Sequence, residues 1–208
     1  MTRRGWAGDP PADDDEARAR IIEAARRCAD QRVGAAFTLS DVAAELGVIR
    51  QTVYRYFPST DHLFAAVGES AVQAFIDRIA DGLAGFDDPV DWVVECVAAG
   101  VEQLPHEHHL TLLLAAGRAE DFTRTFTSDI ALRISGELFR RAPVDWAAAG
   151  FDAAALRELD EVMLRFLQSL VLAPGDQPRS GPELRAFLRR WLAPAVASWP
   201  AGPGATPP

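Results

Sequence analysis

The spacing of the apolar residues constrains this chain more than any other feature of its sequence. Between the two ends, apolar residues recur at intervals of three and four almost everywhere, and no run of β-branched residues alternates with a period of two. Intervals of three and four place side chains on one face of an α-helix, whereas a half-buried strand needs alternation. The sequence therefore predicts an all-α protein.

Residues that favour helix ends divide the chain further. Acidic residues up to Glu16 favour the start of a helix that ends near Gln31, and Thr38 with Asp41 forms a capping box for the next helix, which Gly47 ends. After the first helix, the expected helices cover 39–46, 50–57, 60–83, 89–104, 110–116 and 122–141, followed by two late helices over 156–170 and 184–195.

The two late helices carry the most regular apolar stripes of the chain. Each has apolar residues on more than one face, which indicates that one face packs within the chain and another meets a partner chain. The candidate dimer-interface residues are Leu156, Leu159, Met163, Phe166, Leu170, Leu184, Phe187, Leu188 and Trp191.

Charge at first argues against nucleic acid as a partner. The chain has 30 acidic residues against 21 basic ones, all arginine, and a formal net charge of −9. The imbalance lies after residue 60, however, because residues 1–60 hold nine arginines and nine acids. The N-terminal part is thus neutral, and we expect any DNA contact to rest on a small, specific set of residues.

Residues 39–58 have the composition of a helix-turn-helix. Ala43 is small enough for the crossing of two helices, and Gly47 can adopt the positive φ of the tight turn. In the second helix, Arg50 and Arg55 suit guanine and Gln51 suits adenine, while the hydroxyls of Thr52, Tyr54 and Tyr56 suit phosphates. The alternative is that both tyrosines pack against the first helix and the arginines lie in solvent.

Four short segments carry a specific resemblance: 21–25, 38–43, 47–48 and 52–59. Through them, residues 18–68 resemble the TetR/AcrR family of bacterial transcriptional regulators. The resemblance implies a homodimer with a DNA-binding N-terminal domain and a body in which a small ligand changes the separation of the two recognition helices. It implies base contacts by Ser40, Arg50, Gln51 and Arg55, and phosphate contacts by Thr38, Thr52, Tyr54 and Tyr56. Ile49 and Thr60 depart from the family pattern, which has a polar cap and a lysine at these places, so weaker or differently tuned DNA binding is expected.

A ligand site in the body should be mostly apolar. The candidate pocket residues are Trp92, Cys96, Gly100, Phe122, Phe126 and Phe139. They suit a small hydrophobic ligand, and the alternative is that they are ordinary core residues.

No catalytic motif is present in the sequence. It has no P-loop, no GxGxxG and no GxSxG, Cys28 and Cys96 are isolated, and His106–His109 does not fit the HExxH spacing. We therefore expect no enzymatic activity, no metal and no cofactor. No apolar run approaches the ~18 residues that span a bilayer, and the N-terminus does not have the pattern of a secretory signal, which predicts a cytoplasmic protein with no membrane contact.

These patterns predict a domain order and a function. We expect four parts along the chain: a flexible tail (1–15), a helix-turn-helix domain (16–62), a helical ligand-binding and dimerisation domain (63–199) and a second tail (200–208). The predicted function is a repressor that a small hydrophobic ligand releases from a palindromic double-stranded DNA operator. The alternative is a helical small-molecule-binding or interaction module with weakened DNA binding.

Overall fold

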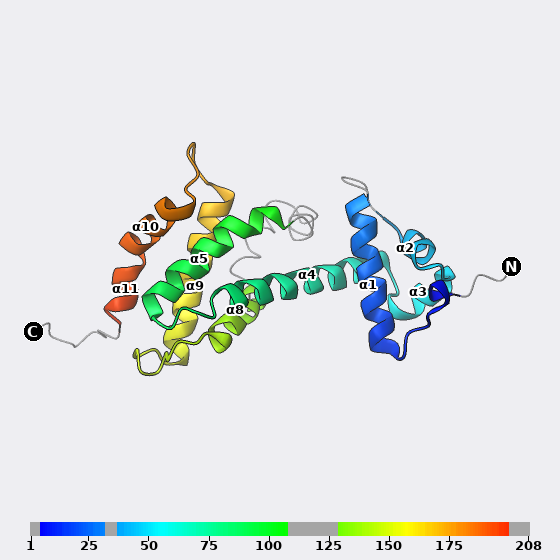
Figure 1. The fold of residues 1–208 in the computed structure, drawn as a ribbon, viewed down its shortest axis with the longest axis horizontal. Coiled ribbons are helices and arrows are strands. Elements are labelled where there is room, and N and C mark those ends of the chain that lie inside the picture. Colours follow the sequence, from blue (N-terminus) through cyan, green and yellow to red (C-terminus); the bar gives the residue numbers. More distant parts are fainter. Residues whose placement is uncertain (1–4, 32–36, 108–128, 200–208) are drawn as a thin grey trace, which may run out of the picture. The chain divides into compact units, whose positions relative to one another are not determined.

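Helices are the only regular secondary structure in the computed structural model, which describes residues 5–31, 37–107 and 129–199 (Figure 1). The prediction of an all-α fold is confirmed. The contacts within the chain divide it into two units, Met1–Gln73 and Ala74–Pro208. Within the described ranges, no helix is both long and apolar enough to span a bilayer.

The first unit is built around one apolar core. Its elements are η1 (Trp6–Gly8), α1 (Asp14–Gln31), α2 (Leu39–Leu46), α3 (Arg50–Tyr56) and the first part of α4 (Thr60–Gly82). α2 contacts both α1 and α3. Ile21 from α1, Val42 from α2, Val53 from α3 and Leu63 from α4 are each completely buried, so every one of these helices contributes to the same core.

Both ends of α2 have the predicted chemistry. The backbone N–H of Asp41 donates to Thr38 Oγ1, and the Asp41 carboxylate accepts the backbone N–H of Thr38 at 2.8 Å, which completes the capping box. Gly47 follows the helix in the left-handed region with φ of 67°, where a side chain would be strained. This turn leads directly into α3.

The second unit is a bundle in which α5 contacts both α9 and α10 (Figure 1). Besides the rest of α4, its elements are α5 (Pro89–Gln103), η2 (Leu104–His106), α8 (Asp129–Arg141), α9 (Ala153–Leu172), α10 (Gly181–Trp191) and α11 (Ala193–Ala197). The Asp88 carboxylate caps α5, and Asp152 caps α9 in the same way.

Polar and apolar contacts together hold α10 to α5. Leu184 and Leu188 are completely buried. Between them, Arg185 donates to Glu95 at 2.8 Å and to Glu102 at 3.0 Å. Burial alone would raise the pKa of Glu102, but Arg185 and the backbone N–H of Gly181 hold it below its ordinary value.

The last predicted helix is divided in two. A single helix was expected over 184–195, but α10 ends at Trp191 and α11 begins at Ala193. Pro194 is the reason, because it has no N–H to donate to the carbonyl of Arg190 and its ring clashes with that carbonyl in a continuous helix. The helix expected over 110–116, and the beginning of the one expected over 122–141, lie outside the described residues.

Candidate nucleic-acid interface

α3 is fixed to its domain by one side of the helix, and its other side faces outward. Val53 is completely buried, and Phe57, directly after the helix, is 1% exposed. Four of the residues proposed to contact DNA lie on the outward side and are exposed: Arg50, Gln51, Tyr54 and Arg55. Thr52 and Tyr56 are half-buried. The buried anchor therefore leaves the polar residues of α3 accessible.

Each arginine of α3 lies on a tyrosine ring. The guanidinium of Arg50 is 4.8 Å from the centroid of the Tyr54 ring and donates to its hydroxyl. Arg55 is 4.5 Å from the Tyr56 ring and donates to that hydroxyl. In each pair, a cation–π contact and a hydrogen bond together hold the guanidinium group against the surface of the helix.

Asp14, in the first turn of α1, also contacts Arg55. Asp14 Oδ1 accepts from Arg55 Nη2 at 2.9 Å and from the Tyr56 hydroxyl at 2.9 Å. Partial burial and this hydrogen bond raise the pKa of Tyr56, although Arg55 opposes the shift. Because the Arg55 and Asp14 side chains are 68% and 78% exposed, the pair is weak and a phosphate or base can replace Asp14.

The other two predicted DNA contacts come from the N-terminal end of α2. Thr38 and Ser40 are both exposed. The Thr38 hydroxyl donates to the Asp41 carboxylate at 2.8 Å, so it already has a structural role as part of the cap. All eight predicted contact residues thus lie on the helix-turn-helix pair or at its first cap, and none is fully buried.

The two departures from the family pattern flank α3. Ile49 occupies the N-cap position, is 69% exposed and makes no side-chain cap bond. Its backbone carbonyl accepts a hydrogen bond from the backbone N–H of Thr52 at 2.9 Å, as the first hydrogen bond of α3. Thr60 begins α4 and is half-buried.

The row of α5 residues that was a candidate ligand pocket lies in the core of the second unit. Trp92 is 1% exposed, and its ring is 5.0 Å from that of Phe139 and 5.4 Å from that of Trp146. A Cβ on Gly100 would lie 3.0 Å from Leu167 Cδ1, so these helices pack closely. Burial, followed by the charge of Asp160, raises the pKa of the Cys96 thiol to about 12. Phe122 and Phe126 lie outside the described residues.

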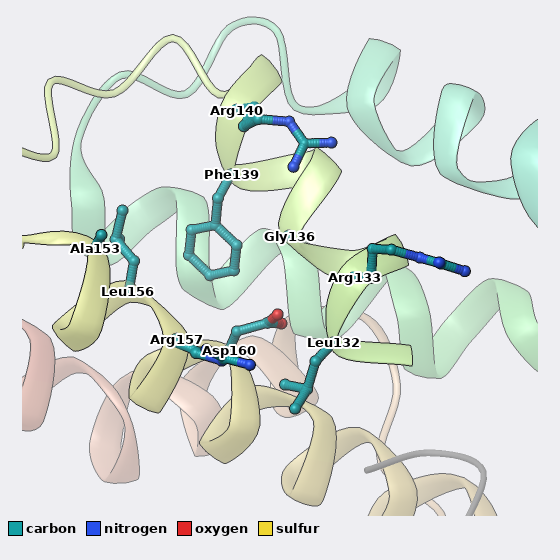
Figure 2. Close-up of a pocket in the computed structure, with 9 residues that line it drawn as sticks. All are labelled: Leu132, Arg133, Gly136, Phe139, Arg140, Ala153, Leu156, Arg157 and Asp160. Carbon is teal, nitrogen blue, oxygen red and sulfur yellow. The ribbon is translucent and has the colours of Figure 1, made fainter. Parts of the chain in front are cut away.

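A cavity of about 540 Å³ lies instead between α8 and α9 (Figure 2). Its lining residues are Leu132, Arg133, Gly136, Phe139, Arg140, Ala153, Leu156, Arg157 and Asp160. Phe139 and Leu156 were already candidates, for the pocket and the dimer interface respectively. Asp160 was missed, although an acid within the apolar stripe of α9 was a signal that could have revealed it.

The candidate dimer residues differ in exposure. Met163, Leu184 and Leu188 are buried within their own chain, whereas Trp191 is 61% exposed. The remaining five residues are half-buried: Leu156, Leu159, Phe166, Leu170 and Phe187. Val162 and Leu172, on the same helix as four of them, are 43% and 41% exposed. Apolar surface thus remains on both late helices after the chain has folded.

Comparison with known proteins agrees with this geometry. Residues 21–67 match the family model described as bacterial regulatory proteins, tetR family. The chain is also similar to the crystal structure of the TetR family repressor AlkX from Dietzia sp. strain DQ12-45-1b, implicated in biodegradation of n-alkanes. That likeness has a TM-score of 0.60 at 20% identity over 90% of this chain and 97% of the other, and it shows the fold. No curated protein matches the chain. The chain therefore carries, at residues 21–67, a helix-turn-helix domain of the kind found in bacterial regulatory proteins of the tetR family.

Proposed function

We propose that this chain is a cytoplasmic repressor that binds a palindromic DNA operator as a homodimer and leaves it when a small apolar ligand enters the body. The observation that carries the proposal is the outward side of α3, where Arg50, Gln51 and Arg55 are accessible while Val53 anchors the helix. The side chains of these three residues suit the edges of guanine and adenine in the major groove.

The remaining polar residues complete the proposed contacts. Ser40 would reach a base edge from α2, and Thr38, Thr52, Tyr54 and Tyr56 would bind phosphates. Because residues 1–60 have as many acids as arginines, the general attraction to DNA is small. Affinity then depends on base contacts, so we expect a large ratio of specific to non-specific binding.

A second copy of the chain is the proposed occupant of the apolar surface on α9 and α10. Trp191, Val162 and Leu172 are the most exposed large apolar residues of these helices. Together they leave apolar surface on both helices, and tryptophan is enriched in protein interfaces. Analytical ultracentrifugation should find a dimer that Trp191→Asp converts to monomer. Trp199→Ala is the matched control, because Trp199 stacks on Phe151 of its own chain at 5.5 Å.

Selection of bound duplexes from a random pool tests the proposed operator binding. The wild type should enrich a palindrome whose half-sites lie about one helical turn, ~34 Å, or a multiple apart. Arg55→Ala should weaken operator binding by about 1–3 kcal/mol and relax the base preference at one position. Arg26→Ala, which removes an arginine of the same domain on α1, should change little. Failure of the folded dimer to enrich any palindrome at low salt would refute the proposal.

A module with weakened DNA binding is the second candidate function. The uncapped Ile49 before α3 and the Asp14 carboxylate on Arg55 favour it. In that case the selection enriches nothing, and Arg55→Ala has no effect on DNA binding. A ligand screen by thermal shift serves both candidates. n-Alkanes belong in it, since the repressor of similar fold is implicated in n-alkane biodegradation.

A further inference from the structure

The described lining of the cavity between α8 and α9 combines apolar side chains with one buried acid and three exposed arginines. Its large apolar side chains are those of Leu132, Phe139 and Leu156 (Figure 2). Among the described residues that line the cavity, Asp160 is the one carboxylate, and it is 4% exposed. A site of this type binds an apolar molecule and fixes its orientation through one polar group.

Asp160 lacks a charged partner within the described part of the chain. Its one hydrogen bond there comes from the Ser135 hydroxyl, which donates to Oδ2 at 2.7 Å. Arg133, Arg140 and Arg157 also line the cavity, but none of them forms an ion pair with Asp160. In Figure 2 the guanidinium of Arg133 points away from the Asp160 carboxylate. A buried carboxylate with one neutral donor is a costly arrangement, and a cation that reaches it relieves that cost.

Gly136 supports the interpretation of this cavity as a binding site. It lies inside α8 and lines the cavity, and a Cβ built on it would have no heavy atom within 4 Å. Glycine destabilises a helix interior relative to alanine. Neither a close approach nor a positive φ requires glycine here, so its observed effect is to leave space in the cavity.

We propose that this cavity is the effector site and that its ligand is a lipophilic cation, an apolar molecule whose single ammonium group donates to the Asp160 carboxylate. The inference rests on the proposed function, because it assigns the site and the chemical class of the ligand that releases the operator. Phe139 and Leu156 enclose the apolar part of the ligand. The ammonium group replaces the missing counter-charge, and charge-assisted hydrogen bonds of this kind are the strong ones.

Three related ligand classes are distinguished by the same geometry. A carboxylate ligand is repelled by the buried Asp160, and the attraction of Arg133, Arg140 and Arg157 is screened by water because all three are exposed. A neutral alkane fills the apolar part and leaves Asp160 without a counter-charge. An alcohol donates one hydrogen bond and does not neutralise the charge, so it binds less tightly than the ammonium ion. The burial that raises the pKa of Asp160 to about 6 still leaves this carboxyl mostly ionised at pH 7.

The test is calorimetric titration of the full-length protein at pH 7 with four probes of equal chain length: n-octylammonium, 1-octanol, octanoate and n-octane. n-Octylammonium should bind most tightly. Asp160→Asn keeps the size of the side chain and an acceptor for Ser135, and should weaken n-octylammonium about 10- to 100-fold while leaving 1-octanol nearly unchanged. Glu158→Gln, which removes an exposed acid of the same helix, is the matched control and should bind like the wild type.

A second variant keeps the test independent of Asp160. Gly136→Leu adds a good helix former that fills the cavity, so it should abolish binding of every probe without loss of the fold. Equal affinity of the wild type and Asp160→Asn for n-octylammonium would overturn the proposal, as would tighter binding of n-octane or octanoate.

Operator release is measured separately on the selected duplex. If the selection enriches a palindrome and n-octylammonium does not bind, the ligand class is wrong and the DNA function stands. If no palindrome is enriched, the proposed function fails whatever calorimetry shows.

Discussion

Replacing Asp160 by asparagine should make the protein more stable at neutral pH, and the gain should depend on pH. Asp160 is 4% exposed, and burial raises the pKa of its carboxyl from 3.8 to about 6 in the folded state, although the hydrogen bond from Ser135 lowers it. Between these two pH values the folded protein binds more protons at Asp160 than the unfolded chain does. Stability from this group is therefore present at low pH and is lost as the pH rises from about 4 to 6.

The size of the effect follows from the two pKa values. One pKa unit corresponds to about 1.4 kcal/mol, so a rise from 3.8 to about 6 removes on the order of 3 kcal/mol of stability at neutral pH. Asparagine does not titrate and can still accept from Ser135. The free energy of unfolding of Asp160→Asn minus that of the wild type should therefore increase by roughly 2–3 kcal/mol between pH 4 and pH 7.

Urea unfolding followed by circular dichroism at several pH values measures this difference. Glu158→Gln is the control, because it removes an exposed acid of the same helix. Other carboxyl groups change the absolute stability of both proteins, and the subtraction removes their contribution. A difference for Asp160→Asn that stays flat from pH 4 to pH 7 would refute the reasoning, since it would mean that Asp160 is solvated or already neutralised.

Three further predictions concern the helix-turn-helix. Ile49→Ser should stabilise the protein by about 1 kcal/mol in urea unfolding because it supplies the missing cap of α3, whereas Ile49→Val, which offers no acceptor, should not. Gly47→Ala should cost about 1–2 kcal/mol, visible as a lower melting temperature, because φ is 67° at this turn; an unchanged melting temperature would contradict the strain argument. Asp14→Asn should strengthen operator binding by about 0.2–1 kcal/mol in fluorescence anisotropy, since it frees Arg55, and the gain should be absent in an Arg55→Ala background.

The first unit could be predicted nearly residue by residue because its signals are local. Thr38 with Asp41 defines one helix start, and Gly47 defines the following turn, since each acts on backbone groups close in sequence. Because the turn at Gly47 ends α2, it also defines where α3 can begin.

The second unit was harder to predict because its features depend on packing between distant helices. An apolar row such as Trp92 and Gly100 has the same spacing whether it lines a pocket or packs against a neighbour, and only the approach of Leu167 shows the packing. Asp160 was missed for a related reason: an acid in an apolar stripe reads as an exposed position until α8 covers it.

The two arginine–tyrosine pairs of α3 have a consequence for the kinetics of DNA recognition. A free arginine side chain carries about 2 kcal/mol of rotamer entropy, which it loses when a base fixes it. Contact with the rings of Tyr54 and Tyr56 already restricts Arg50 and Arg55 in the unbound protein, so part of that entropy is lost on folding rather than on binding. Because residues 1–60 carry no net charge and give little electrostatic steering, we expect the proposed base contacts of Arg50 and Arg55 to produce a long residence time on the correct site rather than fast association.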